Sequence, residues 1–258
     1  MEKKLLDLWY AYPEDLLAED VAAACASLLS EDERARWQRF RFEHGRREYL
    51  ATHALVRTAL SHYRETSPEH WRFTQNEFGK PAVDPDCGLR FNLANSRELV
   101  VCLVAEGAEV GVDVEPHARR GQIAKIAKEV FSPLELAQLD ALSGSEKLDR
   151  GLSLWTLKES YIKARGMGLS LPLKKFSFLF DGARGINLEL DPSLDDKAER
   201  WRFCLLEHAG HRIAAMTERS ADTNLEIWEA HPLLAPPKRL PGCVAEWLPA
   251  LLPGAAHH

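Results

Sequence analysis

The sequence lacks any apolar run long enough to cross a membrane. Its longest apolar stretches, such as residues 99–105 and 248–252, are far shorter than the roughly 20 residues that a spanning helix needs. The first ten residues have no long apolar core and carry Glu2, so they do not resemble a secretion signal. We therefore expect no membrane association and a cytoplasmic location.

Cysteine is scarce and shows no metal-binding or disulfide pattern. The five cysteines are odd in number, scattered and without a Cys-x-x-Cys pair; they are Cys25, Cys87, Cys102, Cys204 and Cys243. This usage indicates reduced core residues in a cytosolic protein rather than zinc ligands or a disulfide framework.

A basic charge balance and several catalytic motifs are missing as well. The formal charge of −6 argues against a nucleic-acid binder, because neutralising phosphates needs a basic surface. The chain has no Gly-x-Ser-x-Gly, no P-loop, no glycine-rich dinucleotide turn and no His-x-x-x-His spacing. These absences exclude the chemistries that depend on those motifs.

Two helix-rich segments follow the same pattern. With 258 residues, 45% of them hydrophobic, the chain can bury a core as one domain or two small ones. Residues 30–33 form a capping box, in which a serine and a glutamate three residues later bind free amides at a helix start, and a helical pattern over residues 46–63 follows. Residues 132–135 repeat this box, and a second helical pattern over residues 152–165 follows it.

Short β-rich runs accompany both helical segments. They lie at residues 5–12, 71–74, 89–93, 99–104, 109–114, 175–180, 187–190, 201–207 and 212–217. The order predicts an α+β fold in which two similar α+β halves form a pseudodimer, although any α+β chain can show such an echo. The runs between residues 71 and 114 are expected to form an antiparallel meander of three or more strands.

The repeat also suggests a division of the chain. We place an N-terminal half at residues 1–108, a C-terminal half at residues 109–230 and a proline-rich tail at residues 231–258. The tail is interpreted either as an extended strap on the body or as a partly disordered end.

Three side chains form a stripe on the second long helix. Trp155, Glu159 and Lys163 are four residues apart, and Gly166 supplies a helix stop. Taken alone, the Glu159–Lys163 pair is typical of a solvated helix face. It becomes functional only if other charged residues converge on it.

Two acids in the run Gly-Val-Asp-Val-Glu-Pro are candidates for that convergence. Strand periodicity places Asp113 and Glu115 on one face and the valines on the other. A solvated strand end explains them, but so does a hard cation such as Mg²⁺, if Glu159 joins them as a third oxygen ligand.

Basic residues form two further candidate surfaces. Residues 33–50 hold six arginines against three glutamates, a net of +3 that suits phosphate groups but also suits a solvated face. Residues 117–131 combine basic side chains with an apolar stripe. That helix would suit an acidic partner helix, although packing onto the protein's own core explains its apolar side equally well.

Several motifs in order resemble one family. They are Phe-Gly-Lys-Pro at residues 78–81, Phe-Asn-Leu at 91–93, Gly-Val-Asp-Val-Glu at 111–115, Phe-Ser with Glu135 at 131–135, and Trp-Thr-Leu-Lys-Glu-Ser-Tyr-Ile-Lys at 155–163. This set is similar to the 4'-phosphopantetheinyl transferases of the longer, pseudodimeric type, over residues 34–178. The resemblance implies an enzyme that moves the phosphopantetheine arm of coenzyme A to a serine of an acyl- or peptidyl-carrier protein, releasing 3',5'-ADP.

The resemblance also implies roles for individual residues. Asp113, Glu115 and Glu159 would bind Mg²⁺, with Mn²⁺ as an alternative, and Glu159 with Lys163 would be catalytic. The expected coenzyme A contacts are Arg36, Arg47, Gly79, Lys80, Pro81, Asn95 and Lys158. The carrier protein would dock near residues 119–131, and the pseudodimer would be a monomer in solution.

One departure from the family pattern concerns residues 93–96. The family usually continues after Phe-Asn with a Ser-His pair, whereas this chain has Leu-Ala-Asn-Ser. Because Asn95 cannot carry charge, coenzyme A should bind more weakly than in relatives with the histidine. A degenerate homologue that binds coenzyme A or a carrier protein without transfer is the alternative function.

Overall fold

The protein is described here by a computed structural model that covers residues 5–182, 185–219 and 224–240. Its helices over these residues are α1 (Glu19–Ser27), α2 (Glu31–Gln38), α3 (Glu43–Tyr63), α4 (Arg120–Val130), α5 (Pro133–Asp140) and α6 (Gly144–Arg165). Its strands there are β1 (Leu6–Ala11), β2 (Arg72–Gln75), β3 (Pro81–Asp84), β4 (Leu89–Asn95), β5 (Val100–Glu106), β6 (Val110–Pro116), β7 (Phe176–Phe180), β8 (Ile186–Leu190), β9 (Trp201–His208), β10 (His211–Glu218), β11 (Glu226–His231) and β12 (Ala235–Arg239).

The strand pairing confirms two similar halves. In the first half β5 lies between β1 and β4, and in the second half β10 lies between β6 and β9; all four pairings are antiparallel. Each half adds a separate hairpin, β2–β3 in the first and β7–β8 in the second. The same local topology therefore occurs twice, as a duplicated α+β unit requires.

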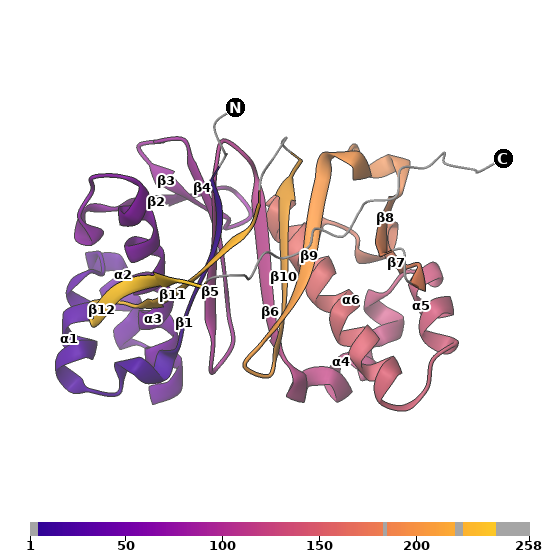
Figure 1. The fold of residues 1–258 in the computed structure, drawn as a ribbon, viewed down its shortest axis with the longest axis horizontal. Helices are drawn as coiled ribbons and strands as arrows, with labels where there is room; N and C mark the ends of the chain where they lie inside the picture. The colour runs from indigo at the N-terminus through magenta and orange to yellow at the C-terminus, as the bar shows by residue number, and fades with distance from the viewer. Residues whose placement is uncertain (1–4, 183–184, 220–223, 241–258) are drawn as a thin grey trace.

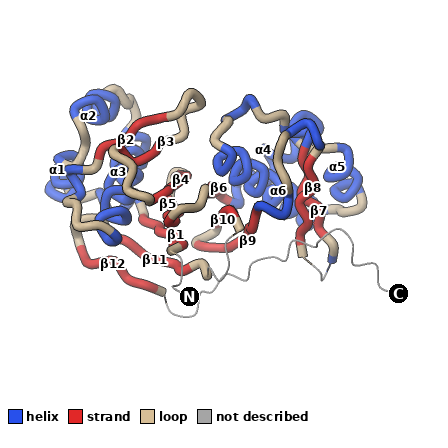
Figure 2. Tube along the Cα trace, turned by 90° about the horizontal axis from the view of Figure 1, so that it is seen from above, coloured by secondary structure: helices blue, strands red, loops and turns tan. Residues whose placement is uncertain are grey.

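The two sheets lie side by side between two groups of helices, α1–α3 on one side and α4–α6 on the other (Figures 1 and 2). Apolar residues of both sheets form a core at the seam, including Leu103 of β5, Val112 and Val114 of β6, and Ile213 of β10. Each helix group packs on the outer face of its own sheet. No helix in the described ranges is long and apolar enough to span a membrane.

Both predicted capping boxes are present. Each capping glutamate also forms an ion pair with a basic side chain of the long helix that follows. Glu33 accepts from Ser30 N and lies 2.6 Å from Arg57 of α3. In the second half, Glu135 accepts from Ser132 N and lies 2.8 Å from Lys158 of α6. The duplication thus extends to an ion pair between the capping glutamate and the following long helix in each half.

The predicted meander over residues 71–114 is wrong. β4 and β5 form an antiparallel hairpin, but β2 pairs with β3 in a separate hairpin and β6 joins β10 in the second sheet. β11 returns across the molecule to pair with β1 in parallel, and β12 pairs with β11, so the start of the tail is a strand. Residues 241–258 lie outside the described residues, and the three-part division of the chain stays a prediction.

Candidate functional site

The candidate site forms where β6 meets α6. Gly111, Asp113 and Glu115 alternate along the face of β6 that lies against α6. A Cβ atom on Gly111 would lie 2.0 Å from the Ser160 carbonyl oxygen and 2.4 Å from the Ala164 amide nitrogen. Only glycine permits so close an approach of strand and helix. This contact brings the two strand acids beside the stripe of α6.

Both strand acids are buried, so the solvated alternative is wrong. Asp113 is 6% exposed and Glu115 is 5% exposed. Lys163 Nζ lies 2.8 Å from Asp113 Oδ1, while Asp113 Oδ2 is buried without a hydrogen-bond partner. The lysine of the predicted stripe therefore neutralises a strand acid.

Glu115 is held by two donors. Arg119 Nη1 donates to both carboxylate oxygens at 2.5 and 2.7 Å, and Trp155 Nε1 donates to Oε1 at 2.8 Å. Burial and the charge of Asp113 raise the pKa of Glu115, against the opposing effects of both donors. Sequence reasoning placed Arg119 on a docking surface and missed this contact, because Glu115 lies in β6 and Arg119 in the turn that follows it, so no periodicity within one element pairs them.

Glu159 lies close enough to the strand acids for their charges to raise its pKa. It is half-buried, and burial followed by the charge of Asp113 raises its pKa to about 7. Lys163 opposes this rise, and Glu115 adds to it. The three carboxyl groups of β6 and α6 therefore lie within electrostatic reach of one another, and that they bind a metal together stays a prediction.

The three acids offer the kind of oxygen ligand that a hard divalent cation takes. Carboxylate oxygens are the ligands that Mg²⁺ prefers, and Asp113 Oδ2 is an acceptor still without a donor. Among the described residues, however, no three such side chains already lie in a metal-binding arrangement. Arg119 donates to both oxygens of Glu115, and a bound cation would share these oxygens with the guanidinium group or displace it.

A pocket of about 460 Å³ lies next to the arginine cluster, the six arginines within residues 33–50. Its walls include Arg36, Tyr49 and Asn95, so the structure brings together two of the predicted coenzyme A contacts. Asn95 Nδ2 donates to Glu48, which lines the same pocket. Arg47 is not among the lining residues; its Nε lies 3.5 Å from Glu43.

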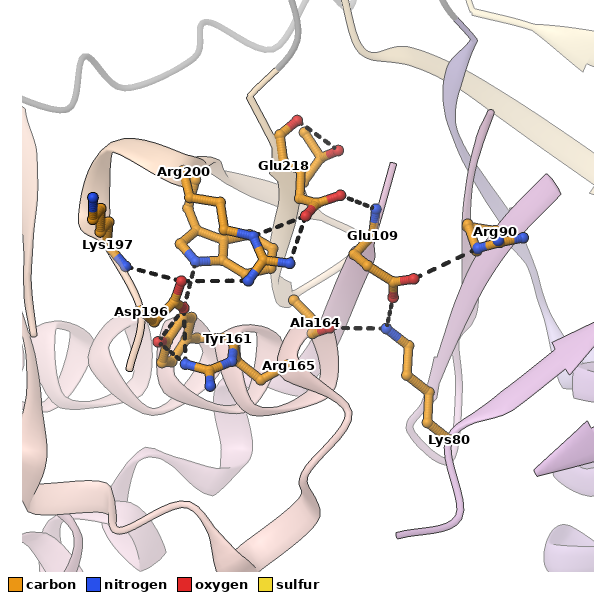
Figure 3. Close-up of polar contacts among 12 residues, drawn as sticks. Lys80, Arg90, Glu109, Tyr161, Ala164, Arg165, Asp196, Lys197, Arg200 and Glu218 are labelled. Atoms are coloured by element: carbon orange, nitrogen blue, oxygen red, sulfur yellow. Dashed lines mark hydrogen bonds and ion pairs between the residues drawn. The ribbon is translucent and has the colours of Figure 1, made fainter. Parts of the chain in front are cut away.

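The Gly79–Pro81 turn borders a different pocket of about 520 Å³ at the seam. Gly79 has a φ of +86°, a backbone conformation that favours glycine. Lys80 Nζ lies 2.5 Å from Glu109 and donates to the Ala164 carbonyl at 2.9 Å (Figure 3). The ammonium group is thus engaged with the second half of the protein.

The prediction that Lys158 contacts the ligand is wrong. The side chain is fully buried, and its ammonium lies 2.8 Å from Glu135 and donates to the carbonyls of Leu173 and Phe176. Burial lowers its pKa to about 8, although Glu135 opposes the shift. Lys158 precedes Glu159 by one residue, so it points about 100° around the helix, away from the functional stripe.

Asn92 is a seam contact that the sequence did not assign. Its side-chain oxygen accepts a hydrogen bond of 2.9 Å from the Val112 amide, which joins β4 of the first half to β6 of the second. The motif Phe-Asn-Leu carried the resemblance, but only the fold assigns a role to its asparagine.

The amino-acid sequence is similar to those of one family of known proteins. The model of the 4'-phosphopantetheinyl transferase superfamily matches residues 109–216. The transferase Sfp of Bacillus subtilis (strain 168) is 29% identical over 73% of this chain and 83% of its own length. Another 4'-phosphopantetheinyl transferase of Bacillus subtilis is 33% identical over 63% of this chain and 71% of its own.

Among solved structures, a holo-(acyl-carrier-protein) synthase from Bacillus anthracis in complex with CoA (3',5'-ADP) covers 44% of this chain and 96% of its own. Its sequence identity to this chain is 19% and the TM-score is 0.37. The sequence matches show that the chain belongs to the 4'-phosphopantetheinyl transferase superfamily. It is an enzyme of that class.

Proposed function

We propose that the enzyme transfers the 4'-phosphopantetheine arm of coenzyme A to a serine of an acyl- or peptidyl-carrier protein, with Mg²⁺ held by Asp113, Glu115 and Glu159. The convergence of these three acids at the β6–α6 contact is the observation that supports the metal site most directly. When bound, the cation would neutralise the pyrophosphate of coenzyme A and favour departure of 3',5'-ADP.

Protein groups then position the reactants and move one proton. The serine oxygen forms a bond to the phosphorus that carries pantetheine, and the bond from that phosphorus to 3',5'-ADP breaks. Glu159 accepts the serine proton, directly or through water, and Lys163 neutralises charge on the leaving phosphate. Phosphoryl transfer needs mainly charge neutralisation and alignment, which Glu159 and Lys163 would supply.

Coenzyme A would extend from this site into the pocket beside the arginine cluster. Arg36 and Asn95 line that pocket, so we assign the 3'-phosphate to it, with Arg47 as a neighbouring positive charge. The Gly79–Pro81 turn would contact the adenine through its backbone, because the Lys80 ammonium is already paired. Mn²⁺ is an alternative to Mg²⁺ at the acids.

The carrier protein would dock along residues 119–131. Ile123 and Val130 of α4 pack into the core of the second half, which accounts for the apolar stripe. Lys125 and Lys128 are exposed, so they remain available to an acidic carrier surface. Carrier docking there places the serine near α6, against which α4 packs.

Intact-mass measurement of a carrier protein tests this function. Purified enzyme with coenzyme A, Mg²⁺ and apo-carrier should add one phosphopantetheine to the carrier, and excess chelator should stop the reaction. An unmodified carrier across acyl- and peptidyl-carrier types would instead favour a degenerate homologue that binds without transfer.

A further inference from the structure

The β2–β3 turn of the first half contacts the C-terminal end of α6 in the second half. Asn76 Nδ2 donates to the Gly166 carbonyl at 2.8 Å, and Lys80 Nζ donates to the Ala164 carbonyl at 2.9 Å. The last carbonyls of a helix have no partner within the helix, so these two donors complete it. The Lys80 charge also lies at the negative end of the helix dipole, where a cation is favourable.

The turn itself is built to present these donors. Asn76 Oδ1 accepts from the amides of Phe78 and Lys80 at 3.0 and 2.8 Å, and Gly79 N donates to the Asn76 carbonyl. The Oδ1 atom of Asn76 therefore stabilises the turn, and its Nδ2 atom binds the end of α6. This division allows the two roles to be separated by substitution.

Gly166 packs closely against the β2–β3 turn. It ends α6 in the left-handed conformation with a φ of +64°, and an added Cβ would lie 2.8 Å from Lys80 Cδ and 3.3 Å from Asn76 Nδ2. Two motifs far apart in the sequence, the Phe-Gly-Lys-Pro turn and the glycine after α6, are parts of one contact.

Glu109, the acid that pairs with Lys80, is itself held by further contacts. Glu109 lies 2.5 Å from Lys80 and 3.5 Å from Arg90, and its amide donates to Glu218 at 2.8 Å (Figure 3). Glu218 in turn lies 2.5 Å from Arg200. Lys80 therefore contacts both Glu109, which directly precedes the strand with the candidate metal ligands, and the helix that carries Glu159.

We infer that Asn76 and Lys80 are positioning residues for the reaction: they hold the end of α6 so that Glu159 and Lys163 keep their alignment with Asp113. Lys163 lies one residue before the Ala164 carbonyl that Lys80 binds, and Glu159 lies about one turn further back. A shift of about 1 Å in reacting groups can cost up to about 100-fold in rate. The inference rests on the proposed function.

The substitution Asn76→Asp tests it with least disturbance. An aspartate keeps the oxygen that accepts the two turn amides but removes the donor to Gly166 and adds a negative charge at the helix end. We expect kcat to fall roughly tenfold, the KM for coenzyme A to change less than about twofold, and the amides of residues 163–166 to exchange hydrogen faster.

Two further variants sharpen the test. Lys80→Met should reproduce the loss of kcat, and Lys80→Arg should restore much of it, because arginine can still donate to Glu109 and the carbonyl. Glu77→Gln changes an exposed residue of the same turn and should leave both kcat and exchange unchanged. A raised KM for coenzyme A with unchanged kcat in Lys80→Met would mean that Lys80 binds substrate and would overturn the inference.

Hydrogen exchange separates this inference from the proposed function. If the wild-type enzyme modified no carrier, the proposed function would fail, while faster exchange at residues 163–166 in Asn76→Asp would still establish the contact. Wild-type exchange and wild-type kcat in Asn76→Asp, with an active parent enzyme, would refute the positioning role alone.

Discussion

Glu159 is the residue on which the proposed chemistry depends most directly. We expect Glu159→Gln to reduce transfer by about 100-fold or more, because it removes a metal ligand and the proton acceptor while preserving the shape of the side chain. The fold should be unaffected, since burial and Asp113 already oppose the charged form of Glu159. Intact-mass turnover and a thermal melt check both parts; near-normal turnover would refute the assignment.

Asn95 is the residue at which the chain departs from its family. It lines the Arg36 pocket and donates to Glu48, so a histidine there would lie beside a carboxylate that favours its charged form. We expect Asn95→His to tighten coenzyme A binding by about two- to fivefold, the value of one partly exposed charge pair. Calorimetric titration with coenzyme A measures this; unchanged affinity would show that the missing charge is unimportant.

At the scale of single residues, the sequence predicted which side chains share a face of one helix or strand. Glu159 and Lys163 share a stripe because helical periodicity is local, and Asp113 and Glu115 share a face because strand periodicity is local. Lys158 was misassigned because its partner, Glu135, comes from another helix. Pairing between elements is a tertiary property that spacing within one element does not contain.

The contact between β6 and α6 is the element-scale feature that assembles the site. We expect Gly111→Ala to destabilise the protein by about 3 kcal/mol or more, because the added Cβ would collide with backbone atoms that cannot rotate away. Gly121→Ala is the matched control: nothing lies within 4 Å of its Cβ position, and alanine favours its helix by up to ~1 kcal/mol. Urea unfolding of both variants measures the difference, and equal stabilities would refute the close approach.

The start of α2 should make folding stability sensitive to acid. Burial would raise the pKa of Glu33, but the hydrogen bond and charge of His53, the Ser30 amide and Arg57 together lower it from 4.5 to about 2. A carboxyl with a lowered folded-state pKa stabilises the fold above pH 4.5, and this contribution is lost as the pH falls toward 2.

The substitution Glu33→Gln isolates this contribution. At pH 7 the variant should be less stable than the wild type by at most about 3 kcal/mol, the value of a pKa lowered from 4.5 to about 2 before solvent screening. Between pH 4.5 and 2 the two free energies of unfolding should converge. Urea titrations across that range check the slope; a constant difference would contradict the assignment.

At the scale of elements, the sequence predicted most helices but not how the strands associate. The capping boxes at Ser30 and Ser132 are local signals, and both helices start there. The pairing of β6 with β10 rather than β5 is decided by which apolar faces meet at the seam. No periodicity within residues 71–114 distinguishes those partners.

The whole molecule combines two copies of one unit, with the site at their seam. The second half supplies the acids and α6, and the first half supplies Asn92, Asn76 and Lys80 across the seam. One chain therefore supplies the residues on both sides of the seam, and we expect a monomer in solution. Light scattering with and without coenzyme A measures this; a dimer that dissociates with loss of activity would contradict it.

The return of β11 to the first sheet has a consequence for biosynthesis. β1, formed from residues 6–11, pairs on one side with β5 and on the other with β11, whose last residue is His231. While the chain emerges from the ribosome, the second side of β1 stays without its partner until more than two hundred further residues have been translated. An open strand edge invites pairing with other chains, so a nascent-chain chaperone would be needed longest at the N-terminal end of this enzyme.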